Sequence, residues 1–491
     1  MNAMQNPEKE IEELKATVAR YFPVYEVRVR PEILTFFVHV EPVTLDNRFD
    51  EMRRQLIPRG YIPFIMKDKG EHIILIQKKP QARFVGSQVN LIMLAITIVT
   101  TVIAGAMLWG AYENIDMFDI RSIGFGALFF ALPLMLILGI HEMGHYITSK
   151  KYQVAASLPF FIPSIPPLGT FGAVISMRDP MPSRKALLDI GISGPLYGLA
   201  VAIPVTLVGL FLIARDPKTA VIVGGDAVAL PSYLYEFLAM FFPLPANARV
   251  HPTAFAGWVG LFVTAMNLLP AGQLDGGHVA RAVLGDRAKY LSYATILAML
   301  MLGLFVYESW LIIALFIMLL GARHPPPLND ITKLGSKRLA VGAVAAIVFF
   351  AAFVPAPLVI VPENPDFEFR ATTPFNVTVP SGTNVTANFT IANSGNTYAN
   401  LYVSLGSSDV ANLREIGIQV VILNYTGPGS NDTVNAENFS VTLTLDQNVN
   451  VTFSINAIAY HGDIPGNPKL VIGASMDSGP AKDLEVSIKV T

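Results

Sequence analysis

The stretch from Ser122 to Ile140 contains no charged residue, and it restricts the fold of this chain more than any other feature. In lipid, such a segment has to satisfy its backbone hydrogen bonds internally, which favours a membrane-spanning helix. Hydrophobic residues make up 52% of the chain and charged residues only 15%. These values indicate an integral membrane protein with soluble parts. The formal net charge of −2 does not suggest a nucleic-acid partner.

Seven apolar segments are predicted to span the membrane as α-helices. The sixth is short for a hydrocarbon core of about 30 Å, so it is either tilted within a bundle or paired as a hairpin with the fifth. The predicted spans are residues 89–111, 122–148, 187–213, 254–270, 290–307, 309–322 and 339–361.

The distribution of Lys and Arg beside these spans predicts the orientation of the chain. One side is rich in them, as at Lys150 and Lys151, and it includes the N-terminus. The other side has far fewer, namely Arg121, Arg215, Lys218 and Arg249. The basic side is therefore predicted to be cytoplasmic, and an odd number of spans places the C-terminus outside. We expect a multi-pass protein of the cell membrane.

Soluble domains are predicted on both sides of the membrane segment. Residues 1–85 alternate between helical and strand patterns, which predicts a cytoplasmic α+β domain. Residues 86–362 form the predicted transmembrane domain. Residues 363–491 are polar and rich in turns, which predicts an extracellular all-β sandwich of the immunoglobulin-like type. The N-x-S/T sequons fall in this last segment, where an outer location would allow N-glycosylation. They begin at Asn376, Asn384, Asn388, Asn424, Asn431, Asn438 and Asn450.

Five residues inside the second predicted span read H-E-x-x-H, from His141 to His145. On a helix, these two histidines share one face, so both imidazoles can bind one metal ion. Glu142 lies beside them, placed to take a proton from a water that the metal activates. Ionisable residues at membrane depth are costly and usually mark a functional site, so a purely structural role is the weaker interpretation.

A catalytic zinc ion usually has three protein ligands, so the two histidines need a partner. Because the chain has no cysteine, His, Asp or Glu must supply it. The best candidate is Asp275, in the run from Asn267 to Gly277, where glycines break an apolar helix. The alternative is an ordinary loop in which Asp275 caps the next helix. His278 is expected to lie beside the ligands without binding the metal.

The motifs H-E-M-G-H and N-L-L-P-A-G-Q-L-D-G-G, in this order on separate spans, resemble those of the site-2 protease family of intramembrane zinc metalloproteases. The resemblance covers about residues 121–290 and is to the prokaryotic, archaeal and plastid members without a PDZ domain. It implies one zinc ion per chain, held in a roughly tetrahedral site by His141, His145 and Asp275. Glu142 would be the general base and acid. Asn267, at the position of the family's invariant asparagine, would donate to the substrate carbonyl or oxyanion.

A third match lies between the second and third spans, in residues 166–177. Its glycines and alternating apolar residues suit a membrane-associated hairpin. The resemblance implies an edge strand that receives an unwound substrate by strand addition. The alternative is a re-entrant loop with a structural role alone. The predicted substrate-binding residues are Gly169, Thr170, Phe171, Gly172 and Ala173.

The predicted function is that of an intramembrane zinc endopeptidase that cuts transmembrane helices of other proteins, in regulated intramembrane proteolysis. Its expected partners are transmembrane protein substrates and the lipid bilayer, and an extracellular ligand of the sandwich domain is a further candidate. The alternative is a catalytically inactive protease relative that acts as a membrane-anchored binding or receptor protein. The presence of Glu142 argues against it, because loss of the base is the simplest route to inactivity. A metal transporter would need polar residues along several spans, whereas here they gather at one depth.

Overall fold

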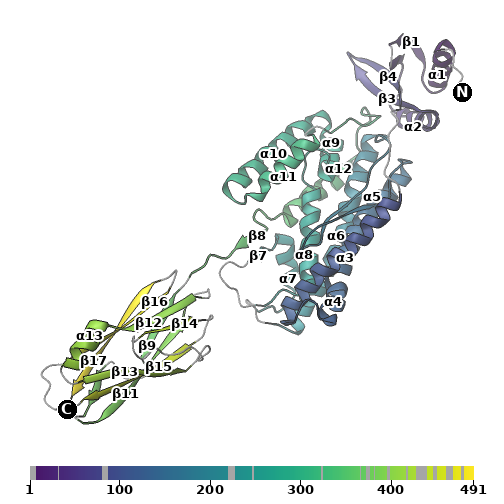
Figure 1. Cartoon of the computed structure of the whole chain (residues 1–491). Coiled ribbons are helices and arrows are strands. Elements are labelled where there is room, and N and C mark those ends of the chain that lie inside the picture. Colours follow the sequence, from purple (N-terminus) through teal and green to yellow (C-terminus); the bar gives the residue numbers. More distant parts are fainter. Residues whose placement is uncertain are drawn as a thin grey trace. The chain divides into compact units, whose positions relative to one another are not determined.

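The computed structural model describes the chain except for residues 1–6, 31–32, 80–86, 219–226, 246–247, 322–323, 365, 372–375, 381, 395–398, 416–417, 427–439, 446–449, 460–467, 477–479 and 491. The chain forms two compact units, which are Met1–Ala220 with Leu230–Pro357, and Val221–Ala229 with Leu358–Thr491 (Figure 1). The first unit contains a small α+β domain and a set of apolar helices. The second unit consists mainly of β-strands.

The N-terminal domain contains a four-stranded antiparallel sheet in the order β1-β2-β4-β3. Apolar residues of the helices and strands meet in one core, in which Phe36, Phe49, Met52 and Ile74 are at most 2% exposed. This agrees with the predicted α+β pattern. The predicted domain boundary at residues 85 and 86 falls on or beside residues outside the described ones, so the domain limits stay predictions. The elements are α1 Pro7–Tyr21, β1 Val24–Val29, β2 Ile33–Val38, α2 Leu45–Leu56, a 3-10 turn Ile57–Arg59, β3 Tyr61–Asp68 and β4 Glu71–Lys78.

A segment from far along the chain completes the core of the N-terminal domain. Leu328 is fully buried among the apolar residues of that domain. The N–H of Ile65 donates to the carbonyl of Leu328 over 2.8 Å, and Asn329 forms a parallel bridge to Ile65. Arg53, which is 2% exposed, donates to the carbonyl of Tyr152 over 3.1 Å. The N-terminal domain is therefore held at one end of the apolar helices.

Apolar helices form the rest of the first unit, and each predicted span overlaps one of them. The prediction of the last span, 339–361, runs too far, because α12 ends at Ala352 and residues Leu358–Ile360 form the strand β8 of the second unit. Their large apolar side chains are often exposed, as for Leu132, Leu136 and Ile147, which is expected of helices that face lipid. The elements are α3 Ser87–Glu113, α4 Ile120–Gly126, a π-helical turn Ala127–Ala131, α5 Leu132–Lys151, α6 Arg184–Arg215, α7 Tyr233–Ala239, α8 Pro252–Asn267, α9 Asp275–Leu284, a 3-10 turn Gly285–Arg287, α10 Ala288–Phe305, α11 Ser309–Leu320 and α12 Ser336–Ala352.

Four helical stretches among the described residues are long and apolar enough to cross a membrane: Gln88–Glu113, Ile120–Lys151, Arg184–Arg215 and Asp275–Phe305. The chain is therefore a membrane protein. The other predicted spans fall on α8, α11 and α12, which have 16, 12 and 17 residues. A helix needs about 20 residues to cross the hydrocarbon core without thinning it, so the number of seven spans stays a prediction.

The short helix α11 packs against α10 as a hairpin, one of the two arrangements expected for this segment. A Cβ atom added to Gly303 of α10 would meet the backbone nitrogen of Leu311 at 2.8 Å, so the two helices are in close contact. The indole N–H of Trp310, at the start of α11, donates to the carbonyl of Pro355 over 2.6 Å. The turn of the hairpin therefore lies at the level where α12 ends.

The second unit contains two main sheets, in the orders β10-β17-β16-β12-β14 and β13-β15-β11-β9, and a short pair, β7 with β8. Two main sheets agree with the all-β prediction, whereas the extracellular location stays a prediction. The predicted glycosylation positions Asn431 and Asn438 lie outside the described residues. The elements are β7 Ala227–Ala229, β8 Leu358–Ile360, β9 Phe367–Ala371, β10 Asn376–Val379, β11 Asn384–Asn393, β12 Ala399–Leu405, α13 Ser407–Glu415, β13 Ile418–Thr426, β14 Ser440–Leu445, β15 Asn450–Ala459, β16 Lys469–Met476 and β17 Ala481–Val490.

Candidate metal centre

The two histidines of the H-E-x-x-H run lie in the middle of α5, on the side that packs against α6. His141 is 4% exposed and His145 is 6% exposed. Their Nε2 atoms are 3.3 Å apart. Residues four apart on a helix lie one above the other, so the spacing in the sequence predicts this pairing correctly.

Asp275 is brought to this pair by the loop between α8 and α9. Its Oδ2 atom lies 3.3 Å from Nε2 of His141 and 3.2 Å from Nε2 of His145. Glycines allow the loop to fold tightly, because a Cβ atom on Gly276 would meet a backbone oxygen at the end of α8 at 2.1 Å. The N-cap of α9 is Leu274, without a side-chain cap hydrogen bond. The alternative role of Asp275 as a helix cap therefore does not hold.

The geometry and chemistry of these three side chains fit a zinc ion. Their ligand atoms form a nearly equilateral triangle with sides of 3.2 to 3.3 Å. Zinc bonds of about 2.0–2.1 Å in a tetrahedron place neighbouring ligand atoms about 3.3–3.4 Å apart. Imidazole nitrogen and carboxylate oxygen are also ligands that zinc takes. Across the described part of the chain, no other group of three His, Asp or Glu side chains is close enough to hold a metal.

A backbone carbonyl of α6 orients the His145 ring. The carbonyl oxygen of Ile190 lies 2.8 Å from Nδ1 of His145. The Nδ1–H therefore donates to this oxygen, and the lone pair of Nε2 points to the other two ligand atoms. The hydroxyl of Ser193 donates to the same carbonyl over 2.8 Å.

Three glycines of α6, absent from the residues predicted above, make room for this arrangement. A Cβ atom on Gly194 would meet Nε2 of His145 at 2.0 Å, and one on Gly198 would meet Nδ1 of His141 at 3.1 Å. A Cβ atom on Gly191 would likewise come too close to α9. Small residues three or four positions apart on an apolar span indicate close packing of membrane helices. The spacing of these glycines was the signal in the sequence that could have predicted the close packing of α6.

A cavity of about 180 Å³ opens beside the ligand triangle. Glu142, which is 6% exposed, places Oε1 3.9 Å from Nε2 of His141. The side-chain nitrogen of Asn267 lies 3.2 Å from the same Nε2 atom. His278 also lines the cavity, but it is outside the group of three ligands. The cavity brings together the five residues predicted to bind the metal or act in catalysis, which are His141, Glu142, His145, Asn267 and Asp275.

The loop between α5 and α6 contains the predicted hairpin, with β5 (Phe160–Pro163) antiparallel to β6 (Thr170–Val174). Of the five predicted substrate-binding residues, Ala173 lines the cavity and the other four do not. Gly169 packs on α3. The hydroxyl of Thr170 donates to the carbonyl of Ile162 over 2.9 Å, inside the hairpin, and Phe171 is 77% exposed. The cavity instead meets the end of β6 and the residues that follow it.

Beyond β6, the chain keeps an extended edge next to the cavity. Backbone groups of Ser176 and Arg178 form hydrogen bonds with residues 155–157. Along an extended chain, successive residues direct their backbone N–H and C=O groups to opposite edges. The backbone groups of Ile175 and Met177 therefore face the edge away from residues 155–157. Both residues line the cavity. Among the described strands, β6 pairs with β5 alone, so this edge has no strand partner there.

Comparison with known families identifies the helical part of the chain. The model described as Peptidase family M50 matches residues 129–307, from the π-helical turn through α10. This segment contains all three candidate ligands. This segment of the chain matches peptidase family M50. This is the site-2 protease family, and the resemblance found in the sequence is confirmed.

Curated relatives of this chain are named as probable zinc metalloproteases. The chain is 34% identical to the chloroplastic protein EGY1 of Arabidopsis thaliana over 245 residues, which is 46% of this chain and 43% of that protein. It is 33% identical to EGY1 of Oryza sativa subsp. japonica, over 47% of this chain and 41% of that protein. It is 28% identical to EGY2 of Arabidopsis thaliana, over 51% and 44%. The chain thus spans less than half the length of these relatives.

Proposed function

We propose that this chain is an intramembrane zinc endopeptidase that hydrolyses peptide bonds in or near transmembrane helices of other proteins. The observation that carries the proposal is the triangle of His141, His145 and Asp275 ligand atoms, placed among apolar helices. The triangle has room for one zinc ion per chain. The zinc metalloprotease names of the plant relatives support the same activity.

Glu142 is the proposed general base and general acid. Bound zinc would supply a Lewis acid that activates a water molecule and polarises the substrate carbonyl. Glu142 takes the proton of the attacking water and passes it to the nitrogen of the leaving amine, so one carboxylate serves both halves of the hydrolysis. Its exposure of 6% keeps bulk water from competing for this hydrogen bond.

Asn267 is the proposed donor to the substrate carbonyl. Its amide nitrogen, 3.2 Å from Nε2 of His141, lies at the edge of the ligand triangle, where the oxygen of a bound peptide would enter. A hydrogen bond to this oxygen becomes stronger as the oxygen gains negative charge in the transition state. Asn267 therefore contributes to the reaction rate as well as to binding.

The free edge formed by Ala173, Ile175 and Met177 is the proposed substrate-binding strand. A transmembrane helix hides its peptide bonds inside its own hydrogen-bonding pattern, so it has to unwind before hydrolysis. In lipid the freed N–H and C=O groups need new partners. An edge strand supplies them by pairing with the extended substrate. The proposed substrate contact therefore lies at and beyond the end of β6, and not at residues 169–172 as the sequence predicted.

The proposed orientation has the N-terminal domain and the end of α5 in the cytoplasm, and the second unit outside the cell. Two observations support it: Lys150 and Lys151 end α5, and the next residue, Tyr152, accepts a hydrogen bond from the N-terminal domain. Location in the cell membrane, N-glycosylation and an extracellular ligand of the second unit belong to the same proposal. The plant relatives carry the word chloroplastic in their names.

The experiment that tests the proposed activity compares the purified chain with Glu142→Gln in cleavage of a transmembrane substrate in detergent. The variant keeps the size of the side chain and both histidines, but the amide cannot accept the proton. We expect unchanged zinc content and a cleavage rate lower by about 10²–10⁴-fold. Cleavage by Glu142→Gln at close to the wild-type rate would refute the mechanism. A wild-type chain that holds zinc and binds the substrate without cutting it would favour the inactive, receptor-like alternative.

A further inference from the structure

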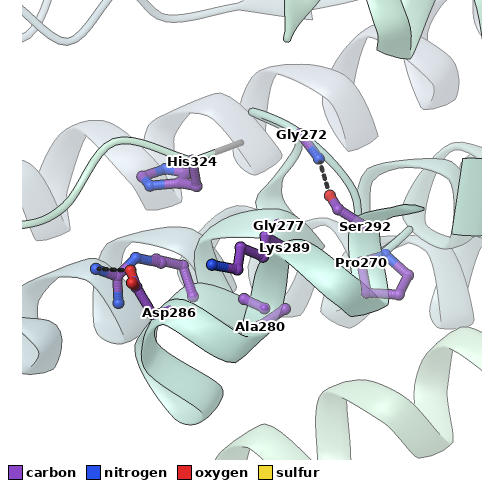
Figure 2. Close-up of a pocket in the computed structure, with 10 residues that line it drawn as sticks. Pro270, Gly272, Gly277, Ala280, Asp286, Lys289, Ser292 and His324 are labelled. Atoms are coloured by element: carbon purple, nitrogen blue, oxygen red, sulfur yellow. Dashed lines mark hydrogen bonds and ion pairs between the residues drawn. The ribbon is translucent and has the colours of Figure 1, made fainter. Parts of the chain in front are cut away.

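A second cavity, of about 120 Å³, lies between α9 and the start of α10. We call it the α9–α10 cavity. Helix α9 lines the metal-site cavity with Asp275 and His278, and it lines this one with Gly277, Ala280 and Arg281, from another face. Figure 2 shows the cavity with Lys289 and Ser292 on one side and His324 on the other. The ring of His324 packs on that of His278 at a centroid distance of 4.4 Å, so the two cavities share a wall.

The lining of this cavity carries excess positive charge. Arg281 is 4% exposed, and its guanidinium pairs with Asp330 over 2.7 and 3.2 Å. Lys289 has no carboxylate partner among the described residues, and its ammonium lies 5.2 Å from the ring centroid of Tyr290. Asp286, the one carboxylate of the lining, is 86% exposed and faces Arg281 rather than Lys289. Lys289 is half-buried, so its charge is only partly solvated, and a partly desolvated cation without a counter-charge favours an anion as its partner.

Hydrogen-bond donors are available in the same place. Ser292 is 5% exposed, and its hydroxyl oxygen accepts the N–H of Gly272 over 2.8 Å (Figure 2). No acceptor for its own O–H is found among the described residues, so this O–H can donate to a ligand. The Lys289 ammonium has three N–H donors. A cavity of about 150 Å³ can hold a benzene molecule. A phosphate group is smaller than benzene, so the cavity of about 120 Å³ has room for such a tetrahedral oxyanion.

The position of the cavity points to lipid as the source of that group. Lys289 is followed by the exposed residues Tyr290 and Tyr293, which are 65% and 43% exposed. Tyr and Lys at the start of an apolar helix mark the level of the lipid headgroups. Basic pockets between membrane helices on the cytoplasmic side bind anionic headgroups.

We propose that the α9–α10 cavity binds the phosphate group of an anionic phospholipid, with the half-buried Lys289 and with Ser292 as hydrogen-bond donors, and with the buried Arg281 as a further positive charge. The same wall carries Gly272 and Gly277, which belong to the tightly packed loop and helix that hold Asp275. A bound headgroup therefore stiffens the support of the third metal ligand. The binding itself does not depend on the proposed protease activity.

The test uses the purified full chain and native mass spectrometry with added phosphatidylglycerol or phosphatidylcholine. Lys289→Gln removes the charge inside the cavity. The control is Arg287→Gln, which removes the same charge two residues earlier, from an exposed side chain outside the lining. We expect one phosphatidylglycerol to bind the wild type and Arg287→Gln with equal affinity. Lys289→Gln should bind it at least about tenfold more weakly, the loss expected for one charge-assisted hydrogen bond.

Ala280→Leu provides a second variant, because it fills the cavity without changing charge. It should lose phosphatidylglycerol and keep its zinc content, which shows that the chain still folds. A parallel series measures the melting temperature with inorganic phosphate and no added lipid. Stabilisation by phosphate that Lys289→Gln abolishes, with no preference for phosphatidylglycerol, would confirm a phosphate site and overturn the lipid as its source. Equal lipid binding by Lys289→Gln and Arg287→Gln would overturn the proposal.

Discussion

Replacing Gly194 with Ala tests whether α6 holds His145 in position. The added Cβ atom would lie 2.0 Å from Nε2 of His145, 2.4 Å from Cδ2 and 2.7 Å from Cε1. Ordinary contacts of a Cβ atom begin at 3.4 Å, so the ring or the helix has to move by about 1.4 Å. Metal-ligand distances in a functional site tolerate deviations of only about 0.2 Å. The variant therefore loses His145 as a ligand in its present geometry.

The expected loss of zinc affinity exceeds about 100-fold. Removing a residue that only supports a ligand costs about 10–100-fold in metal affinity, and here the ligand itself is displaced. Helix propensity works in the opposite direction, because Ala is better than Gly in a helix by about 0.8–1.0 kcal/mol. A loss of zinc cannot then be assigned to a weaker helix.

Two other glycines give graded controls. In Gly198→Ala the new Cβ atom would be 3.1 Å from Nδ1 of His141, so a shift of a few tenths of an ångström is enough, and the loss should be smaller. In Gly139→Ala the nearest atom is 3.9 Å away, an ordinary contact, and zinc binding should not change. The assay is competition with a chromophoric chelator, with cleavage measured on the same samples. If Gly194→Ala binds zinc as well as Gly139→Ala, the packing of α6 on His145 does not define the site.

Further predictions concern the third ligand, the metal and the topology. Asp275→Ala should lower zinc content well below one ion per chain, measured by elemental analysis, and full occupancy would show that another residue is the third ligand. Removal of zinc by a chelator should lower the melting temperature of the wild type much more than that of Asp275→Ala, because the variant has no complete site to lose. An impermeant thiol reagent should label Asn384→Cys in intact cells and leave Lys150→Cys unlabelled, an assay made simple by the absence of native cysteine. Labelling at position 150 would reject the proposed orientation.

The parts of the site that the sequence predicts are those set by local spacing or by a motif. Helical periodicity alone places His141 beside His145. Asp275 is 130 residues further on than His145, so it was chosen from the glycine-broken run around it, and the motif resemblance supported that choice. The role of Gly194 was not predicted, because it depends on which helix packs against α5. No local sequence pattern indicates that packing. The sequence predicted a hairpin in residues 166–177, which contain β6 but not its partner β5. It did not predict which residues reach the cavity, because that depends on how the hairpin packs on the helices.

The burial of Leu328 in the N-terminal domain has a consequence for how the protein is made. The first 78 residues contain every helix and strand of that domain, yet its core stays open until residue 328 has left the ribosome, after α11. During synthesis the nascent domain therefore keeps apolar core surface exposed while the helices up to α11 are inserted into the membrane. The domain can close only after the segment between α11 and α12 has been synthesised. Deleting residues 1–78 would also expose Leu328 to water. Such a truncation therefore perturbs the junction between α11 and α12 as well as removing the domain.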